Sequence, residues 1–276
     1  MIVVLLWAPY HPQPDNDHSP AVIVQPLPPD LARWPTSKVV AVSRDDGRLV
    51  ADIRAALRAA ADPIKAGPMQ AYMKSEMPFL GVQKPTRARA LRPALQANLL
   101  GCRTDWEAAI RELWDDAAYR EERYAATDVA QARAYTEWSR DPASLPLYDH
   151  LIVTGAWWDH VDDIAIRLVG RVLRHDPVAT APLIRAWSRD SDRWRRRTSV
   201  ICQIGSGEEI DVELLRECVL ANIDDPDFFL RKGIGWALRQ HAKLDPAWVR
   251  TFVSIHHDQL SPLSRREALK NIFTGA

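Results

Sequence analysis

Apolar residues recur three and four positions apart along almost the whole chain after Arg48. Leu49, Ile53 and Leu57 form the first such stripe. This spacing places apolar side chains on one face of an α-helix, whereas a strand exposed on one face alternates with a period of two. We find no convincing alternating pattern after residue 48. The sequence therefore predicts an all-α protein of about a dozen helices.

Local signals mark where these helices end and begin. Asp-Pro pairs follow apolar stripes at 176–177, 225–226 and 245–246. Proline restricts the residue before it and fits the first turn of a helix, so each pair ends one helix and opens the next. The segment Thr104–Glu107 has the form of a capping box, which predicts a helix that begins beside Thr104.

The helices also repeat along the chain. The segments 192–197 and 227–232 both open an apolar helix and lie 35 residues apart, and 159–162 lies one similar step earlier. A period of roughly 30 to 50 residues with two helices per step is typical of a HEAT-like α-solenoid. Equivalent positions of successive repeats line one face of a solenoid. The period thus predicts a shared face for Asp162, Arg197 and Lys232.

Two tryptophans extend this face. Trp158 precedes Asp162 by four residues and Trp236 follows Lys232 by four, so each pair shares one side of its helix. An aromatic ring beside a carboxylate attracts cations. We therefore expect one wall of a concave surface to present these side chains together with Arg197. The alternative interpretation is structural: Trp157 packs inside and Trp158 is half-buried beside it.

The charge totals conceal an unusual composition. The chain has 36 basic and 36 acidic residues, yet 29 of the basic residues are Arg, and it has 11 Trp against 5 Phe. The run 193–197 carries four Arg in five positions. An anion such as phosphate would relieve their mutual repulsion, which favours nucleic acid as a partner. A solvated surface is the alternative.

The first 48 residues differ from the rest. They hold 8 of the 20 prolines, and proline fixes φ and removes a hydrogen-bond donor. We expect a loosely ordered extension over 1–48, with an ordered arm as the alternative, followed by a repeat domain over 49–276.

Other features bear on location and cofactors. No apolar stretch approaches the roughly 18 residues of a membrane span, and residues 1–8 make a weak signal peptide. The three cysteines form no CxxC pair, which suggests free thiols in a reducing cytoplasm. The segment His256-His257-Asp258 fits no usual metal site. Motifs for phosphate loops, zinc proteases and serine hydrolases are missing from the sequence, so we expect neither a cofactor nor a metal.

Five motifs stand in order along the chain: Met69–Pro85, Ile110–Asp115, Leu151–Asp163, Ile234–Arg239 and Leu260–Ala268. Together they resemble the AlkD-type DNA alkylation-repair glycosylases. The resemblance covers residue 50 or so to the C-terminus. It implies a HEAT-like superhelix whose concave face holds duplex DNA, and release of purines alkylated at N3 or N7. We expect a monomer that acts on the nucleoid.

The resemblance also implies roles for individual residues. Asp162 matches the catalytic carboxylate of the family, and Trp158 and Trp236 match its two cleft tryptophans. Arg197 matches its cleft arginine near the DNA backbone. Tyr72 and Gln83 match positions that line the DNA side. We expect Lys232 to contact DNA as well, because the repeat period places it on the same face.

Two rival functions remain at this stage. A HEAT-like protein that binds DNA structure without catalysis is expected to have lost the carboxylate at 162 or the cleft tryptophans, and this chain keeps them. A protein-binding HEAT scaffold would need no aspartate between tryptophans. Steep salt dependence of DNA binding would speak against the scaffold.

Overall fold

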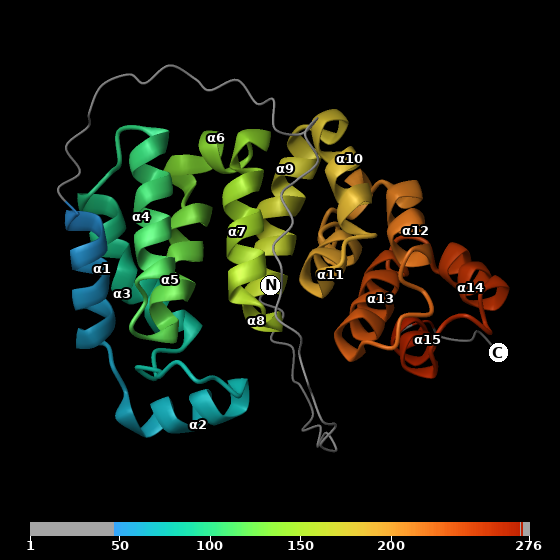
Figure 1. The fold of residues 1–276 in the computed structure, drawn as a ribbon, viewed down its shortest axis with the longest axis horizontal. Helices are drawn as coiled ribbons and strands as arrows, with labels where there is room; N and C mark the ends of the chain where they lie inside the picture. Colours follow the sequence, from blue (N-terminus) through green and yellow to red (C-terminus); the bar gives the residue numbers. More distant parts are fainter. Residues whose placement is uncertain (1–46, 271, 273–276) are drawn as a thin grey trace. The chain divides into compact units, whose positions relative to one another are not determined.

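A computed structural model describes residues 47–270 and residue 272, and this part of the chain contains helices and no strand. The helices follow one another in chain order from α1 to α15 (Figure 1). The predicted extension 1–48 lies almost wholly outside the described residues; α1 begins at Arg48. None of the described helices combines the length and apolar character needed to cross a membrane.

The numbering runs past the predicted dozen for two reasons. Helix α6 is a single turn, and α8 and α9 are parts of one helix joined by a π-helical segment, Ala165–Val169. The α-helices are α1 (Arg48–Ala59), α2 (Pro63–Met73), α3 (Lys84–Ala97), α4 (Arg103–Asp115), α5 (Arg120–Gln131), α6 (Thr136–Ser139), α7 (Leu145–Gly155), α8 (Trp158–Ile164), α9 (Gly170–His175), α10 (Pro177–Trp187), α11 (Arg193–Ile201), α12 (Val212–Leu220), α13 (Phe228–His241), α14 (Pro246–Ile255) and α15 (Pro262–Leu269).

Aspartate begins many of these helices. A carboxylate at the N-cap accepts hydrogen bonds from backbone N–H groups of the first turn, which otherwise lack partners. Two of the Asp-Pro predictions are confirmed, at Asp176 and Asp245, but α13 is capped by Asp227 rather than Asp225. The capping-box prediction is wrong, because α4 already begins at Arg103. The aspartate caps are Asp62, Asp176, Asp192, Asp211, Asp227 and Asp245.

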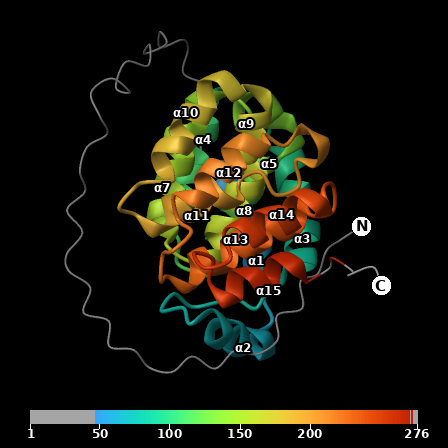
Figure 2. The same ribbon diagram turned by 90° about the vertical axis from the view of Figure 1, so that its right-hand side faces the viewer.

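The helices pack as the repeat period predicts. The second helices of successive repeats, α11, α13 and α15, pack on one another in order. The first helices α10 and α12 pack on each other in a second layer. Both also pack on α11 of the first layer. Helix α2 lies to one side of the stack in both views (Figures 1 and 2). The described residues therefore form the expected all-α solenoid.

Much of the tryptophan excess serves the core. Trp106 and Trp114 are fully buried, and Trp187 and Trp194 nearly so. These large rings fill the space between the helix layers and remove much apolar area from water. The number of tryptophans therefore indicates a well-filled core before it indicates a binding site.

Candidate active site

A carboxylate and a guanidinium from different repeats meet at the centre of the candidate site. Arg197 of α11 donates from Nε to Asp162 Oδ1 at 2.7 Å and from Nη2 to Oδ2 at 2.8 Å, and Asp162 lies on α8. The third nitrogen, Nη1, donates to the backbone carbonyl of Phe229 at the start of α13. Parallel N–H···O bonds of this kind fix both groups in orientation. Asp162 and Arg197, which the repeat period predicted to share a face, are thus in direct contact.

Helix α13 packs closely against the Arg197 guanidinium. A Cβ on Gly233 would lie 3.1 Å from Arg197 Nη1, so a larger residue there would press on the guanidinium. The Arg197 side chain is only 4% exposed, whereas the Asp162 side chain is 16% exposed. The carboxylate is therefore the member of the pair that faces outward more.

The surroundings of Asp162 also affect its ionisation. Burial raises the pKa of the Asp162 carboxyl above its ordinary value, and the Arg197 guanidinium opposes that shift. Asp159 and Asp163 on the same helix add to the rise. Lowering the pH therefore protonates Asp162 earlier than an exposed aspartate.

The two adjacent tryptophans point to different places because only one is helical. Trp157 is the extended N-cap of α8, and its ring packs against Trp194 and Phe229 with centroids 6.4 and 5.5 Å away. Trp158 is the first helical residue, and its ring meets Tyr72 of α2 edge to face at 6.5 Å. Tyr72 is exposed and Trp158 half-buried. The structure therefore brings Tyr72 and Trp158 together, and Trp158 lies one helical turn before Asp162 on α8.

Trp236, the other predicted cleft tryptophan, lies on α13. Trp236 is half-buried and packs against the core. It lies one turn beyond Gly233, whose backbone approaches the Arg197 guanidinium. Lys232, on the same helix, forms an ion pair with Glu267 of α15 at 2.9 Å. These two predicted site residues thus lie on α13, whose Phe229 carbonyl accepts a hydrogen bond from Arg197.

Gln83 is positioned by a buried carboxylate that the sequence analysis missed. Gln83 is the N-cap of α3, and the backbone before it donates three N–H bonds to Glu121, from Leu80, Gly81 and Val82, at 2.8–3.0 Å. Glu121 lies on α5 and is fully buried. Gly81 has φ +83°, and a Cβ there would lie 2.1 Å from a backbone oxygen, so only glycine fits this turn.

The other carboxylates of α8 have partners of their own. Asp159 binds Arg120 at 2.7 Å and accepts a bond from the Tyr124 hydroxyl. Burial opposes ionisation of Asp159, but these groups hold its pKa below the ordinary value. Asp163 binds Lys84 and Arg167, both at 3.0 Å. Arg167 follows Asp163 by four residues, but the other pairs join helices far apart in the chain, so sequence spacing did not reveal them.

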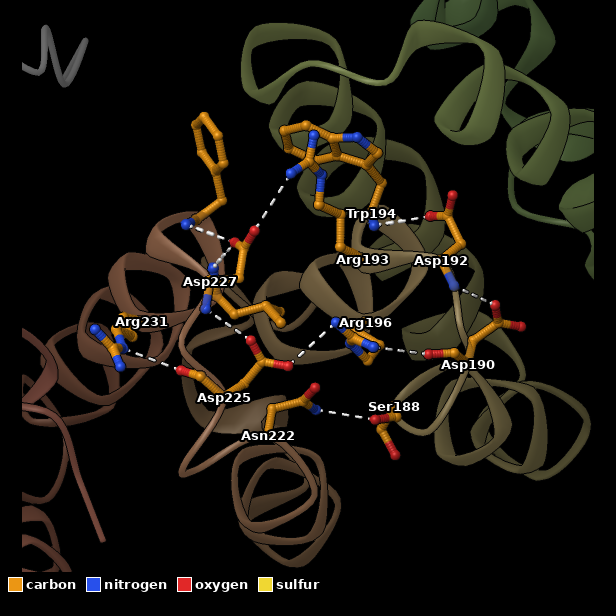
Figure 3. Close-up of polar contacts among 12 residues, drawn as sticks. Ser188, Asp190, Asp192, Arg193, Trp194, Arg196, Asn222, Asp225, Asp227 and Arg231 are labelled. Atoms are coloured by element: carbon orange, nitrogen blue, oxygen red, sulfur yellow. Dashed lines mark hydrogen bonds and ion pairs between the residues drawn. The ribbon is translucent and has the colours of Figure 1, made fainter. Parts of the chain in front are cut away.

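The arginine run 193–197 is neutralised by the protein itself. Arg193 pairs with Asp227, and Arg196 pairs with Asp225 in the next repeat (Figure 3). Arg195 pairs with Asp149 at 2.7 Å. The expectation that an external anion relieves this repulsion is therefore wrong, because one aspartate or more lies within reach of each guanidinium.

The described residues hold no group of three or more His, Cys, Asp or Glu side chains placed to bind a metal ion. His257 contacts Asp258 on the exposed surface at 3.0 Å, and both side chains face solvent. The candidate site instead centres on the Asp162 carboxylate, which is paired with Arg197 and lies one turn after Trp158 on α8.

A family model described as a DNA alkylation repair enzyme matches residues 53–272, which is most of the chain. The chain belongs to this DNA alkylation repair enzyme family. A solved structure described as a predicted DNA alkylation repair enzyme from Enterococcus faecalis is similar, with a TM-score of 0.70 and 26% identity. That similarity covers 78% of this chain and 98% of the other. A search of curated proteins finds no match.

Proposed function

We propose that this repair enzyme is a DNA glycosylase that hydrolyses the N-glycosidic bond of cationic N3- or N7-alkylated purines in duplex DNA. The observation that carries the proposal is the Asp162 carboxylate, held by both oxygens on Arg197 and placed one turn after Trp158. A charge fixed before the reaction begins stabilises a transition state without the cost of reorganisation.

The chemistry needs little more than such a charge. An alkylated purine that is already cationic leaves with the bonding electron pair of the C1′–N bond and becomes neutral. The sugar develops oxocarbenium character, which a carboxylate beside it stabilises. Water then forms the new bond to C1′ and releases a proton. We assign Asp162 to stabilising the sugar and orienting this water.

The neighbouring residues take supporting roles in the proposal. Trp158 and Trp236 hold the deoxyribose and the lesion by aromatic contact, which favours cations. Tyr72, Gln83 and Lys232 contact the DNA. Arg197 contributes chiefly by positioning Asp162, and it approaches a phosphate only while sharing its guanidinium with that carboxylate.

The substitution Asp162→Asn tests the mechanism directly. The amide keeps the size of the side chain but removes the negative charge, so release of free base from a duplex that carries N7-methylguanine should fall about 10²- to 10³-fold. Binding of the duplex should change little. Base release is measured by chromatography, with Asp258→Asn as a control at an exposed aspartate. Normal release by Asp162→Asn would contradict the mechanism.

One observation favours a second function. The guanidinium of Arg197 already neutralises much of the charge on Asp162, and a protein that only binds DNA structure needs no free carboxylate. In that case wild-type protein in excess over the methylated duplex releases no base, yet still binds the duplex. The same assay therefore separates a glycosylase from a non-catalytic DNA-binding solenoid.

A further inference from the structure

Helix α2 is attached to the rest of the fold without a packed apolar face. The structure describes all of its residues, Pro63–Met73, and none of them is fully buried. A cavity of about 270 Å³ separates Met69 and Met73 of α2 from residues of α3, α5 and α8. Helices in proteins gain most of their stability from packing of an apolar face. The position of α2 therefore depends on the segments at its ends.

The segment that follows α2, residues 74–83, is fixed on the first turn of α5. Glu121 accepts backbone N–H groups near the end of this segment. The backbone N–H of Arg120 donates to the carbonyl of Pro78 at 2.9 Å, and Arg120 Nη1 donates to Ser75 Oγ at 3.3 Å. Two adjacent residues of α5 thus hold the segment at both of its ends.

The same guanidinium also binds the helix that carries Trp158. Arg120 donates from Nη2 to Asp159 Oδ1 at 2.7 Å and from Nε to Asp159 Oδ2 at 3.1 Å. Both side chains are nearly buried, with 8% and 7% exposed. Paired bonds of this kind fix the orientation of both groups, and Asp159 directly follows Trp158 in the chain. One arginine therefore connects the segment after α2 to the start of α8.

The position of Tyr72 depends on Ser75. The Ser75 backbone N–H donates to the Gln70 carbonyl at 3.2 Å, and Gln70 Nε2 donates to the Ser75 carbonyl at 3.1 Å. Movement of Ser75 therefore moves the last turn of α2, which carries Tyr72. The Tyr72 ring meets the Trp158 ring edge to face with centroids 6.5 Å apart. The contacts of Ser75 thus set the separation of these two rings.

We propose that Arg120 is a positioning residue for DNA binding. By joining Ser75 to Asp159, it holds two aromatic rings at a fixed separation before DNA arrives. These rings, Tyr72 and Trp158, contact the duplex in the proposed function, on which this inference rests. Groups that are held in the bound geometry beforehand lose less conformational freedom on binding, so the complex is tighter.

The substitution Ser75→Ala tests the proposal with little risk to folding. It removes the hydroxyl group that binds Arg120 and the Met77 carbonyl, and it leaves the ion pair of Arg120 with Asp159 in place. We expect binding of a methylated duplex to weaken about five-fold, as for the loss of one hydrogen bond. Fluorescence anisotropy measures binding, and thermal unfolding checks the fold.

A second variant changes the arginine itself. Arg120→Lys keeps the positive charge, but one ammonium group cannot reproduce the paired contact with Asp159 and also reach Ser75. Arg120→Lys should therefore weaken duplex binding at least as much as Ser75→Ala. Arg195→Lys is the matched control, because Arg195 also makes two bonds of 2.7 Å to an aspartate, Asp149, which lies on α7. Duplex binding by the control should be unchanged.

A double-mutant cycle with Tyr72→Ala separates positioning from a general loss of stability. If Ser75 acts through Tyr72, Ser75→Ala should weaken binding less than about two-fold in protein that already carries Tyr72→Ala. A general loss of stability would weaken binding by the same factor with and without Tyr72. Equal factors, or binding by Ser75→Ala that matches the wild type, would overturn the proposal.

Base release measured on the same preparations distinguishes this proposal from the glycosylase. Release of base by the wild type without coupling between Ser75 and Tyr72 rejects the positioning role and supports the glycosylase. Coupling in duplex binding without any release supports the positioning role and rejects the glycosylase. Absence of duplex binding by the wild type rejects both.

Discussion

At the scale of single residues, the repeat period was the informative signal. Asp162 and Arg197 are 35 residues apart, and that spacing alone predicted a common face. It did not predict that the two side chains bind each other through two hydrogen bonds. Spacing gives the side of a helix, but the contact depends on how closely α8 and α11 approach, which long-range packing decides. The family resemblance named the carboxylate, and the structure adds its partner.

The ionisation of Asp162 leads to a prediction about pH. Because the proposed role needs the carboxylate and burial raises its pKa, base release should fall as the pH is lowered. The midpoint should lie above about 3.9, the value for an unperturbed aspartate. Rates of release from N7-methylguanine duplex are measured across acidic pH under single-turnover conditions. Asp162→Asn, which has no carboxyl to protonate, is the reference. Its residual rate should not show this fall at low pH, which we call the acid limb of the pH profile.

A substitution at Arg197 provides a further check on the acid limb of the pH profile. Its guanidinium opposes the rise in the pKa of Asp162, and lysine keeps the charge but cannot make the same paired contact. Arg197→Lys should therefore move the acid midpoint to higher pH. An unchanged midpoint in Arg197→Lys would show that the limb reports another group.

At the scale of elements, capping was only partly predictable. Asp-Pro pairs located two helix starts correctly, because both the cap and the proline are local signals. Trp157 and Trp158 are adjacent in the sequence, yet only Trp158 lies within α8, because Trp157 is the extended N-cap of that helix. Helix ends depend on which nearby group satisfies the first N–H donors, so a pattern locates them only to within a residue or two.

The segment before α3 depends on a contact across 40 residues of sequence. Glu121 accepts three backbone N–H bonds from this segment, and Gln83 begins α3 directly after it. No local pattern indicates such a contact. A segment that looks like a loop in the sequence is thereby fixed against α5.

Glu121→Gln should loosen this segment. The amide offers one oxygen for three donors and turns an N–H group toward at least one of them, so we expect a loss of about 2–4 kcal/mol in the free energy of unfolding. Denaturant unfolding measures the loss, and amide exchange of Leu80, Gly81 and Val82 should accelerate. Glu112→Gln, at an exposed salt bridge with Arg54, should change stability by less than about 1 kcal/mol. Equal effects of the two substitutions would contradict this account.

At the scale of the whole molecule, many acidic residues of the described chain have local partners. Aspartates cap helices, and Asp149, Asp225 and Asp227 neutralise the arginine run 193–197. The composition did not reveal this because totals carry no information on position. In the proposed function, partly exposed cations near Asp162 contribute to the attraction for DNA.

Two such cations lie near the candidate site. Lys84 and Arg167 are each about half exposed, and both pair with Asp163 of α8. If each neutralises one phosphate, the logarithm of the DNA association constant should fall with the logarithm of salt concentration with a slope of about −1.8. A basic DNA-binding protein with many phosphate contacts shows a much steeper slope.

Lys84→Ala should make this slope shallower by about 0.9, because one phosphate contact is lost. Lys65→Ala is the matched control: this lysine is also on the surface and ion-paired, with Asp62 at the start of α2, and its loss changes the net charge equally. Fluorescence anisotropy with a methylated duplex at several salt concentrations measures both slopes. If the variants shift the slope equally, attraction follows net charge instead of position. Because the chain is neutral as a whole, a slope near zero in the wild type would exclude the phosphate contacts and favour a protein-binding solenoid.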